Sequence, residues 1–379
     1  MYSLAVSALL AQAVVAFPHV NNNINKRNAT NPTLDGTPEF IGLLADPELN
    51  RDSCGSARFG DRAFWVCRDS QHYDENGIPS LPLITTTASW SDIKEGGGVD
   101  LTWYGNNHDQ SFYPQIPGNC DDNAAGACPD GTRYVIWPNS PPMVVSDAGG
   151  VVTAYAWSLN SYIKGLENII ADPSTALYKI TYSGSGSGDE LPDVEIVDEA
   201  FWAENEIPFG DYGNVIVNGT AYLYGKGSDG KVALARCPAD SVEDKSTYEF
   251  YVGGSWTSEK PSLGDEAAAL DNVSAGGQGT YYYSEHWQSY VWIGQSGISV
   301  GADFFITTSP SPEGPWIEPF NFFSAVSGTH DLGAYTLQAH PAFSSPDVNE
   351  IYITYTKNDV VSEDVALYTH PLYRVQWAD

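Results

Sequence analysis

Two aspartates are spaced so that a single β-hairpin would bring their carboxyl groups to one place. Asp52 stands at the start of a predicted strand, and Asp69 closes the next apolar run, which begins at Phe64. Because neighbouring antiparallel strands run in opposite directions, the start of one lies beside the end of the other. Cleavage of a glycosidic bond needs such a pair. One carboxylic acid protonates the leaving oxygen, and the other carboxylate activates water or attacks the anomeric carbon.

Each of these aspartates follows an arginine, Arg51 or Arg68. A neighbouring guanidinium would hold one carboxylate ionised and leave its partner to carry the proton. The alternative interpretation is structural, because aspartates in loops commonly cap turns or pair with nearby arginines. The spacing leaves both interpretations open and makes Asp52 and Asp69 the candidate catalytic pair.

The elements that must position this pair are β-strands. Runs rich in β-branched and aromatic residues follow a period of two, and each is bounded by Gly, Asn, Asp or Pro. The runs cover residues 64–67, 151–157, 221–224, 290–293 and 351–355. Only 241–248 and 265–271 have helical character. The Ser-Gly stretch at 183–188 is typical of a loop tip rather than a linker. We therefore expect an all-β chain with one domain, residues 46–379.

A weak repeat refines this fold class to a five-bladed β-propeller. Five times, a polar or glycine-bearing segment leads into an apolar strand, at intervals of roughly 60 to 85 residues, somewhat longer than the usual blade. These leading segments are residues 51–52, 137–139, 209–211, 276–279 and 339–341. Five sheets arranged radially would bury these strands and protect their edges. A pair of β-sandwiches is the alternative. In a propeller the inner strands begin around a central channel, so the five leading segments would converge on one ligand site.

Six further residues in or near these segments are candidate substrate-binding residues. Their polar groups could hydrogen-bond sugar hydroxyls, and their aromatic rings could stack on sugar C–H faces, although core packing is the commoner role of such rings. Asp211 could supply a third carboxylate, whereas a lone His340 before a proline could equally be structural. The candidates are Arg51, Trp137, Asp211, Gln278, Tyr335 and His340.

Segments 51–56 and 64–70 resemble the opening signature of a family described as a domain of unknown function, whose bacterial members are endo-D-arabinanases. The similarity continues at residues 232–239, 248–250, 314–316, 339–341 and 373–375. The resemblance implies a five-bladed propeller glycoside hydrolase in which Asp52 and Asp69 are catalytic. The family pattern favours Arg-Asp-Gly-Gly where this chain has Arg-Asp-Ser-Cys-Gly, so the substrate of the bacterial members does not transfer automatically.

The N-terminus predicts export. An apolar stretch over residues 4–15 precedes small residues and is too short to span a bilayer, which needs roughly 20 apolar residues. We interpret residues 1–16 as a signal peptide and residues 17–27, which end at the dibasic pair Lys26-Arg27, as a propeptide. Residues 28–45 would form an N-terminal extension. No later apolar run is long enough for a membrane anchor, so we expect a secreted, extracellular protein.

The composition agrees with export and excludes one class of partner. Sequons at Asn28, Asn218 and Asn272 are predicted N-glycosylation sites. The formal net charge is −31, from 17 Lys and Arg against 48 Asp and Glu. Nucleic acid binding relies on clustered basic residues, so this balance argues against it.

Five cysteines fit an oxidising compartment. Cys120 and Cys128 bracket a short loop whose Gly and Ala content lets it close, which predicts a disulfide. Cys54, Cys67 and Cys237 leave one thiol over. A Cys54–Cys67 pair with Cys237 free and buried is favoured, but the sequence leaves this pairing open.

Motifs for other chemistry are absent or lack their structural context. The chain has no Cys-x-x-Cys or paired-His spacing and no P-loop. The strings Gly-x-Gly-x-x-Gly and Gly-x-Ser-x-Gly occur at residues 225–230 and 297–301, but neither leads directly into a segment with helical character, which a dinucleotide site or a nucleophile elbow needs. We therefore predict neither a metal nor a cofactor, and esterase, kinase and dehydrogenase activities lack support.

Together these observations predict a secreted, endo-D-arabinanase-like glycoside hydrolase acting on a furanosidic or related wall polysaccharide. The alternative is a non-catalytic, lectin-like propeller that binds carbohydrate but lacks a productive acid pair. The expected partner is a polysaccharide or oligosaccharide, without nucleic acid or membrane, and the expected state is a monomer.

Overall fold

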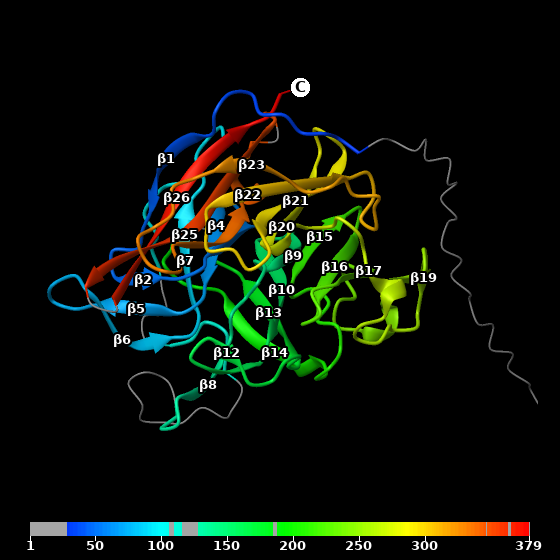
Figure 1. Ribbon diagram of the computed structural model, residues 1–379, viewed down its shortest axis with the longest axis horizontal. Helices are drawn as coiled ribbons and strands as arrows, with labels where there is room; N and C mark the ends of the chain where they lie inside the picture. Colours follow the sequence, from blue (N-terminus) through cyan, green and yellow to red (C-terminus); the bar gives the residue numbers. More distant parts are fainter. Residues whose placement is uncertain are drawn as a thin grey trace, which may run out of the picture.

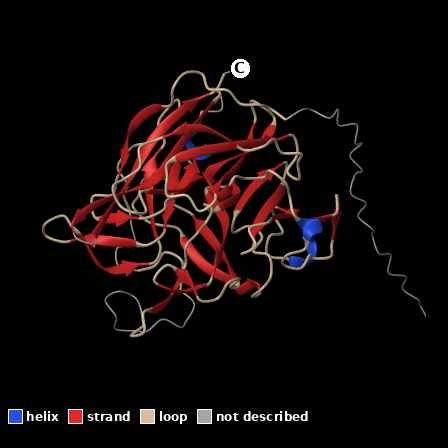
Figure 2. Cartoon of the chain, viewed as in Figure 1, coloured by secondary structure: helices blue, strands red, loops and turns tan. Residues whose placement is uncertain are grey.

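Strands account for nearly all the regular structure of this protein (Figure 2). The computed structural model describes residues 29–105, 110–115, 128–184, 188–345, 347–362 and 365–378. Within these ranges the helices are three single-turn 3-10 helices, η1 (Lys245–Thr247), η2 (Glu266–Ala268) and η3 (Pro341–Phe343). The first two lie in the segments predicted to have helical character. No helix in the described ranges is long and apolar enough to cross a membrane.

Three bent strands near the N-terminus each contribute to two sheets. The β3 sheet contains β3 (Gly55–Phe59), β4 (Arg62–Cys67) and β7 (Thr87–Asp92). A smaller sheet contains β2 (Leu49–Arg51), β5 (Ser70–Tyr73) and β6 (Pro79–Ile84). The chain passes almost directly from β2 to β3, from β4 to β5 and from β6 to β7. Asp52 and Asp69 lie at two of these bends.

The next part of the chain repeats this arrangement. The β9 sheet contains β9 (Met143–Ala148), β10 (Val151–Leu159), β13 (Thr175–Tyr182) and β14 (Asp193–Trp202). The small sheet beside it contains β8 (Thr132–Val135), β11 (Ser161–Lys164) and β12 (Glu167–Asn168). Because β11 follows β10 after a single residue, the two sheets again share a bent strand.

Three further sheets follow in sequence. The β15 sheet contains β15 (Gly213–Val217), β16 (Thr220–Lys226), β17 (Val232–Pro238), β18 (Glu249–Val252) and β19 (Ser255–Thr257). The β20 sheet contains β20 (Gly276–Ser284), β21 (Ser289–Ser296), β22 (Asp303–Ser309) and β23 (Phe320–Ser324). The β24 sheet contains β24 (Ala334–Ala339), β25 (Glu350–Ser362), β26 (Val365–Gln376) and β1 (Glu39–Leu44).

The β24 sheet joins the two ends of the described chain. Strand β1 pairs antiparallel with β26 from Glu39 opposite Arg374 to Leu44 opposite His370, and the two strands lie side by side in Figure 1. The predicted N-terminal extension, residues 28–45, therefore contributes a strand to the last sheet.

The five apolar runs found in the sequence form the second strand of each main sheet. They lie in β4, β10, β16, β21 and β25. Strand β4 is buried at every position, including Trp65, which is 0% exposed. A strand covered on both faces is apolar almost throughout, so β4 is more continuously apolar than the period of two expected from the sequence.

The core consists of five apolar clusters, and each lies between two of the main sheets. Four clusters join sheets that follow one another in sequence, and the fifth joins the last sheet to the first. One residue pair from each cluster illustrates this order: Trp90 and Tyr178, Trp157 and Leu223, Tyr224 and Trp292, Ile293 and Ile353, Tyr352 and Trp65.

The favoured cysteine pairing is confirmed. Cys54 and Cys67 form a disulfide with their Cα atoms 4.0 Å apart, and Cys237 is free and buried. The predicted bridge between Cys120 and Cys128 involves Cys120, which lies outside the described residues.

Two of the three sequons can be placed. Asn218 and Asn272 are exposed residues with left-handed backbone conformations, φ 51° and 58°. Asn218 lies in the turn between β15 and β16. Asn28 falls outside the described residues, as do the predicted signal peptide (1–16) and propeptide (17–27).

Candidate active site

Asp52 and Asp69 are neighbours across the hairpin that the sequence predicts. The amide of Asp52 donates to the carbonyl of Asp69 at 3.0 Å, and the amide of Arg68 donates to the carbonyl of Asp52 at 2.8 Å. The disulfide between Cys54 and Cys67 clamps the same two strands just beyond the aspartates. Backbone hydrogen bonds and a covalent link therefore fix the relative position of the pair.

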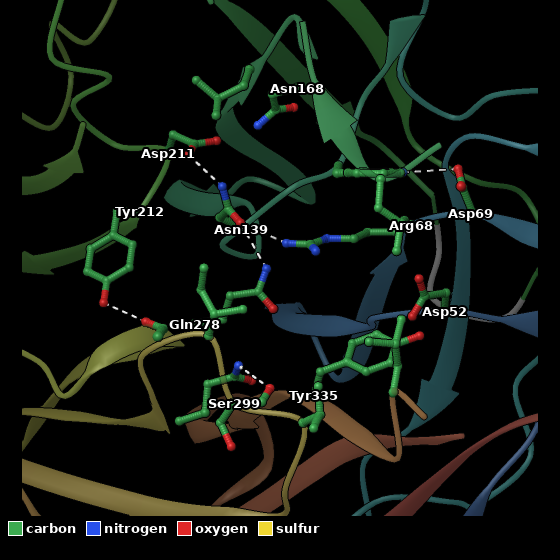
Figure 3. Close-up of a pocket in the computed structure, with 18 of the residues that line it drawn as sticks. Asp52, Arg68, Asp69, Asn139, Asn168, Asp211, Tyr212, Gln278, Ser299 and Tyr335 are labelled. Carbon is green, nitrogen blue, oxygen red and sulfur yellow. Dashed lines mark hydrogen bonds between the residues drawn. The ribbon is translucent and has the colours of Figure 1, made fainter. Parts of the chain in front are cut away.

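The pair opens into a cavity of about 1000 Å³ (Figure 3). Five residues of the cavity floor lie at or near the start of the first strand of each main sheet. The residues that do so, in sheet order, are Asp52, Asn139, Asp211, Gln278 and Tyr335. Segments that are far apart in the sequence thus meet at one site.

Asp69 carries its negative charge against a guanidinium. Arg133 forms an ion pair with it, in which Nη2 contacts Oδ2 and Nη1 lies 3.4 Å from Oδ1. The indole N–H of Trp137 donates to Oδ1 at 3.1 Å. The carboxylate keeps an exposed fraction of 13%, so it remains accessible from the cavity.

Asp52 occupies a contrasting environment. Its Oδ1 accepts a hydrogen bond from the Ser53 hydroxyl at 2.7 Å, and its carboxyl group also bonds with Tyr335. Burial raises the pKa of Asp52 to about 6, although these hydrogen bonds and the charge of Arg68 oppose the shift. A carboxylic acid that holds its proton to this pH can protonate a leaving group.

A third carboxyl group lies across the cavity from this pair (Figure 3). Asp211 is only 3% exposed, and its Oδ2 accepts a hydrogen bond from Asn139 at 2.6 Å. Its Oδ1 is buried without a hydrogen-bond partner. Burial raises the pKa of Asp211 to about 7, against the opposing effects of Asn139 and Arg68.

Arg68 lies between these acids (Figure 3). Its Nη2 donates to the side-chain oxygen of Asn139 at 2.7 Å, and its Nε donates to the carbonyl of Pro138 at 3.1 Å. Both Asp52 and Asp211 interact electrostatically with its guanidinium. The positive charge of Arg68 thus stabilises the ionised form of both carboxyl groups, whereas burial favours their protonated form.

Two residues beside Asp52 have strained backbones. Ser53 has φ 52° and Thr336 has φ 50°. A left-handed conformation is rare for a β-branched residue and costs roughly 1–3 kcal/mol. The two hydroxyls lie 2.8 Å apart, and the Thr336 hydroxyl lies 2.7 Å from the side-chain amide of Gln278. Such strain concentrates at functional sites, because the surroundings must hold it in place.

The structure brings four of the six predicted substrate-binding residues into the cavity. Trp137, Asp211, Gln278 and Tyr335 line it together with the two aspartates. The other two predicted residues, Arg51 and His340, lie elsewhere.

Arg51 is buried beneath the hairpin instead of facing the cavity. It is 1% exposed, forms an ion pair with Asp46 at 2.7 Å and donates to the Thr87 hydroxyl at 2.7 Å. Side chains alternate between the two faces of a strand, so the residue next to Asp52 points away from it. The guanidinium that pairs with the second aspartate, Asp69, is that of Arg133.

His340 lies at the far end of its strand. The sequence pattern predicts that residues 339–341 begin an inner strand, but that strand is β24, and it begins at Ala334 and ends at Ala339. At about 3.3 Å per residue, His340 is roughly 16 Å from Tyr335, which lines the cavity. It is 0% exposed and its ring bonds with Ser56 and Thr354.

Several residues that line the cavity were not among the predicted site residues, including Asn139, Arg133 and Tyr368. Asn139 lies two positions after Trp137, in a segment that the repeat had singled out, so its place carried a usable signal. Arg133 and Tyr368 come from β8 and β26. Only tertiary packing brings them to Asp69 and Tyr335, so their local sequence gives no comparable signal.

The described residues contain no group of three or more His, Cys, Asp or Glu side chains arranged to hold a metal ion. The side chains that line the cavity offer acid–base and electrostatic chemistry. An acid with a raised pKa, an acid that is ion-paired with Arg133 and the Arg68 guanidinium face the same cavity.

A family model described as a domain of unknown function (DUF5005) matches residues 170–373, more than half of the chain. The chain belongs to this family. The matched segment of this DUF5005 protein includes Asp211, Gln278 and Tyr335, whereas Asp52 and Asp69 precede it. The match confirms membership in a family described as a domain of unknown function, whereas the link to endo-D-arabinanases stays a proposal. No curated protein sequence matches the chain.

Several solved structures are similar to this DUF5005 protein at low sequence identity. A candidate hydrolase from Bacteroides ovatus is 17% identical, with a TM-score of 0.59 over 89% of this chain and 87% of that one. An exo-β-1,3-galactanase from Phanerochaete chrysosporium is 11% identical, with a TM-score of 0.48 over 92% and 67%. An α-L-arabinofuranosidase catalytic domain from Coprinopsis cinerea is 9% identical, with a TM-score of 0.45 over 89% and 96%. The first structure shows a common fold, and the two lower scores support no conclusion about function.

Proposed function

We propose that this protein is a glycoside hydrolase that cleaves a furanosidic, arabinan-like or related wall polysaccharide. The observation that carries the proposal is the adjacency of Asp52 and Asp69 in one cavity with two different environments. Burial raises the pKa of Asp52 to about 6, whereas Asp69 is ion-paired with Arg133. Glycosidic cleavage needs this division between a proton donor and a charged partner.

In the proposed mechanism, Asp52 protonates the leaving glycosidic oxygen. Asp69 either activates a water molecule or attacks the anomeric carbon, and its negative charge stabilises the oxocarbenium-like transition state. Asp211 lines the cavity, and its carboxyl group would hydrogen-bond a sugar hydroxyl. Trp137, Gln278 and Tyr335 would bind other parts of the sugar.

We further propose that the sheets form five blades of a propeller. The five apolar clusters support this, because they join each main sheet to the next and the last to the first. Export is part of the same proposal. The N-terminal leader and the sequons support it, and so does the Cys54–Cys67 disulfide, since such bonds persist in oxidising compartments.

The direct test is product release from a panel of wall polysaccharides that includes D- and L-arabinans. The purified mature protein is compared with its Asp52→Asn variant and with Asp61→Asn. Asp61 is an exposed aspartate in the turn at the opposite end of the same hairpin, so it controls for loss of charge. We expect products from the native protein and from Asp61→Asn, and none from Asp52→Asn.

The pH dependence of kcat/KM provides a second readout. If Asp52 is the acid, the rate should fall as pH rises through about 6, because its proton is lost there. Polysaccharide binding without any product from the native protein would instead indicate the lectin-like alternative. In that case Asp52 and Asp69 would be ligand-binding acids.

A further inference from the structure

The mouth of the cavity is apolar, whereas its floor is polar. Ile298 and Leu166 are the two most exposed large hydrophobic side chains in the described ranges, at 104% and 74%, and both line the cavity. Leu81 and Val300 line it too and are 53% and 44% exposed. On the floor, by contrast, the carboxyl group of Asp211 is almost fully buried.

These exposed side chains come from three separate segments. Leu81 lies in β6, Leu166 lies in the turn between β11 and β12, and Ile298 and Val300 lie in the loop between β21 and β22. Figure 3 shows Asn168 and Ser299, which are neighbours of Leu166 and Ile298 in the sequence, at opposite sides of the cavity. The apolar residues of the lining therefore come from separate segments of the chain rather than from one strand or loop.

Partly buried aliphatic side chains extend this rim inward. Leu83, Leu332 and Val365 also line the cavity and have intermediate exposure. Single exposed hydrophobic residues are normal on a protein surface. Several exposed aliphatic side chains on the lining of one cavity are different, even with the exposed polar Asn168 and Ser228 among them, because such surfaces mark the places where apolar ligands bind.

The aromatic rings of the cavity lie deeper than this rim. Tyr212 is buried, and Trp137, Tyr335 and Tyr368 are partly buried. No exposed aromatic side chain lines the cavity in the part of the chain that the structure describes. A second sugar ring at the mouth would have no flat face to stack on there, whereas a flexible aliphatic chain would find matching branched side chains.

We propose that the substrate carries an aliphatic acyl or alkyl chain close to the bond that is cleaved. The sugar lies on the polar floor, and the chain lies between the loops that hold Leu166 and Ile298. This inference rests on the proposed hydrolase function, because only then is the ligand a substrate. Binding of the aliphatic chain can nevertheless be measured without turnover.

The first measurement uses a neutral apolar fluorophore, N-phenyl-1-naphthylamine, as the probe. It is titrated into the native protein and into a double variant, Leu166→Ser with Ile298→Ser. Both side chains are exposed, so their replacement should not unfold the protein. We expect saturable binding to the native protein and at least fivefold weaker binding to the rim variant.

The matched control replaces exposed valines away from the cavity. Val326 is 70% exposed and Val348 is 40% exposed, and neither lines the cavity. The double variant Val326→Ser with Val348→Ser should bind the fluorophore as the native protein does. Equal binding by the rim variant and this control would overturn the inference.

The second measurement compares n-octyl and methyl D-arabinofuranosides by calorimetry with the Asp52→Asn variant, which prevents turnover. Each methylene group that becomes buried should tighten binding about fourfold. With three methylenes between the rim side chains, the octyl compound should bind roughly fiftyfold tighter. Adding the Leu166→Ser and Ile298→Ser changes should remove most of this preference.

The outcomes separate this inference from the proposed function. Fluorophore binding and a strong octyl preference, with no hydrolysis of any glycoside, would support the chain-binding rim and refute the hydrolase. Hydrolysis of unsubstituted glycans with equal octyl and methyl affinities would support the hydrolase and refute the rim. Fluorophore binding without an octyl preference would also refute it and point to a protein-docking surface.

Discussion

The two ends of the inner strands bury polar groups in opposite ways. At the cavity end, Asp211 keeps a buried oxygen without a partner. At the other end, the ring nitrogens of His340 lie 2.8 Å from the Ser56 hydroxyl and 2.7 Å from the Thr354 hydroxyl. Native proteins satisfy most buried polar groups, so an unsatisfied one beside a cavity marks a place for a ligand. His340, fully bonded and inaccessible, instead stabilises the packing of two sheets.

The two ends also respond to pH in opposite directions. Burial raises the pKa of Asp211 to about 7 but lowers the pKa of His340 to about 3 and that of His370 to about 4. The protonated aspartate contributes stability that is lost as pH rises from about 4 through 7. The neutral histidines contribute stability that is present above about 6.5 and lost as pH falls towards 3–4. One structure thus contains an acid-favoured site and an acid-sensitive core.

The largest expected effect is on catalysis. Asp52→Asn should lower kcat by roughly 10²–10⁴-fold, because it removes the proton donor while keeping the shape of the side chain. Its melting temperature should not fall. Rates and thermal melts of the same preparation check this. Full activity in the variant would show that Asp52 is not the acid, and the contrast between a catalytic end and a structural end of the inner strands would then fail.

The next effect is on stability. Between pH 4 and pH 7 the free energy of unfolding of Asp211→Asn should rise relative to that of the native protein, on the order of 3 kcal/mol. The native carboxyl group must either ionise while buried or bind a proton in this range, and the asparagine does neither. Urea unfolding at both pH values measures the difference. Asp61→Asn, an exposed control, should show no such trend. A variant that loses stability equally at both pH values would contradict the assigned shift.

Removal of the disulfide should have an effect of similar size. The double change Cys54→Ser with Cys67→Ser opens a short loop and should lower the free energy of unfolding by about 3 kcal/mol. Activity should also fall, because the bond clamps the hairpin that positions Asp52 and Asp69. Chemical unfolding and product release should therefore change together, and a variant with native kcat would show that backbone hydrogen bonds position the pair unaided.

The smallest effect belongs to the other end of the strand. His340→Ala should destabilise the fold by about 2 kcal/mol, since it leaves the Ser56 and Thr354 hydroxyls unpaired and opens a small cavity. The folded variant should keep kcat within about threefold. Comparing its melting temperature and kcat with those of Asp52→Asn gives the sharpest contrast, and a large loss of kcat alone would move His340 into the catalytic machinery.

The amino-acid sequence alone determined the all-β class, the central strand of each sheet and the pairing of Asp52 with Asp69. These features depend on local patterns. A strand buried on both faces leaves a visible apolar run, and a short hairpin places the ends of its two strands together. The sequence favoured the Cys54–Cys67 disulfide but left it open, and the structure settles it, because the same hairpin puts the two cysteines opposite one another.

Only the tertiary structure decided which polar residues reach the cavity. Arg51 and Arg133 look alike in the sequence, yet strand alternation turns the first towards Asp46, and packing between sheets brings the second to Asp69. The sequence pattern placed His340 at the cavity end of an inner strand, whereas it follows the far end of β24. The repeat marks the apolar strand β25 but gives no sign of where the preceding strand, β24, begins. Contacts between residues distant in the chain arise from the packing of whole sheets, and no local pattern encodes them.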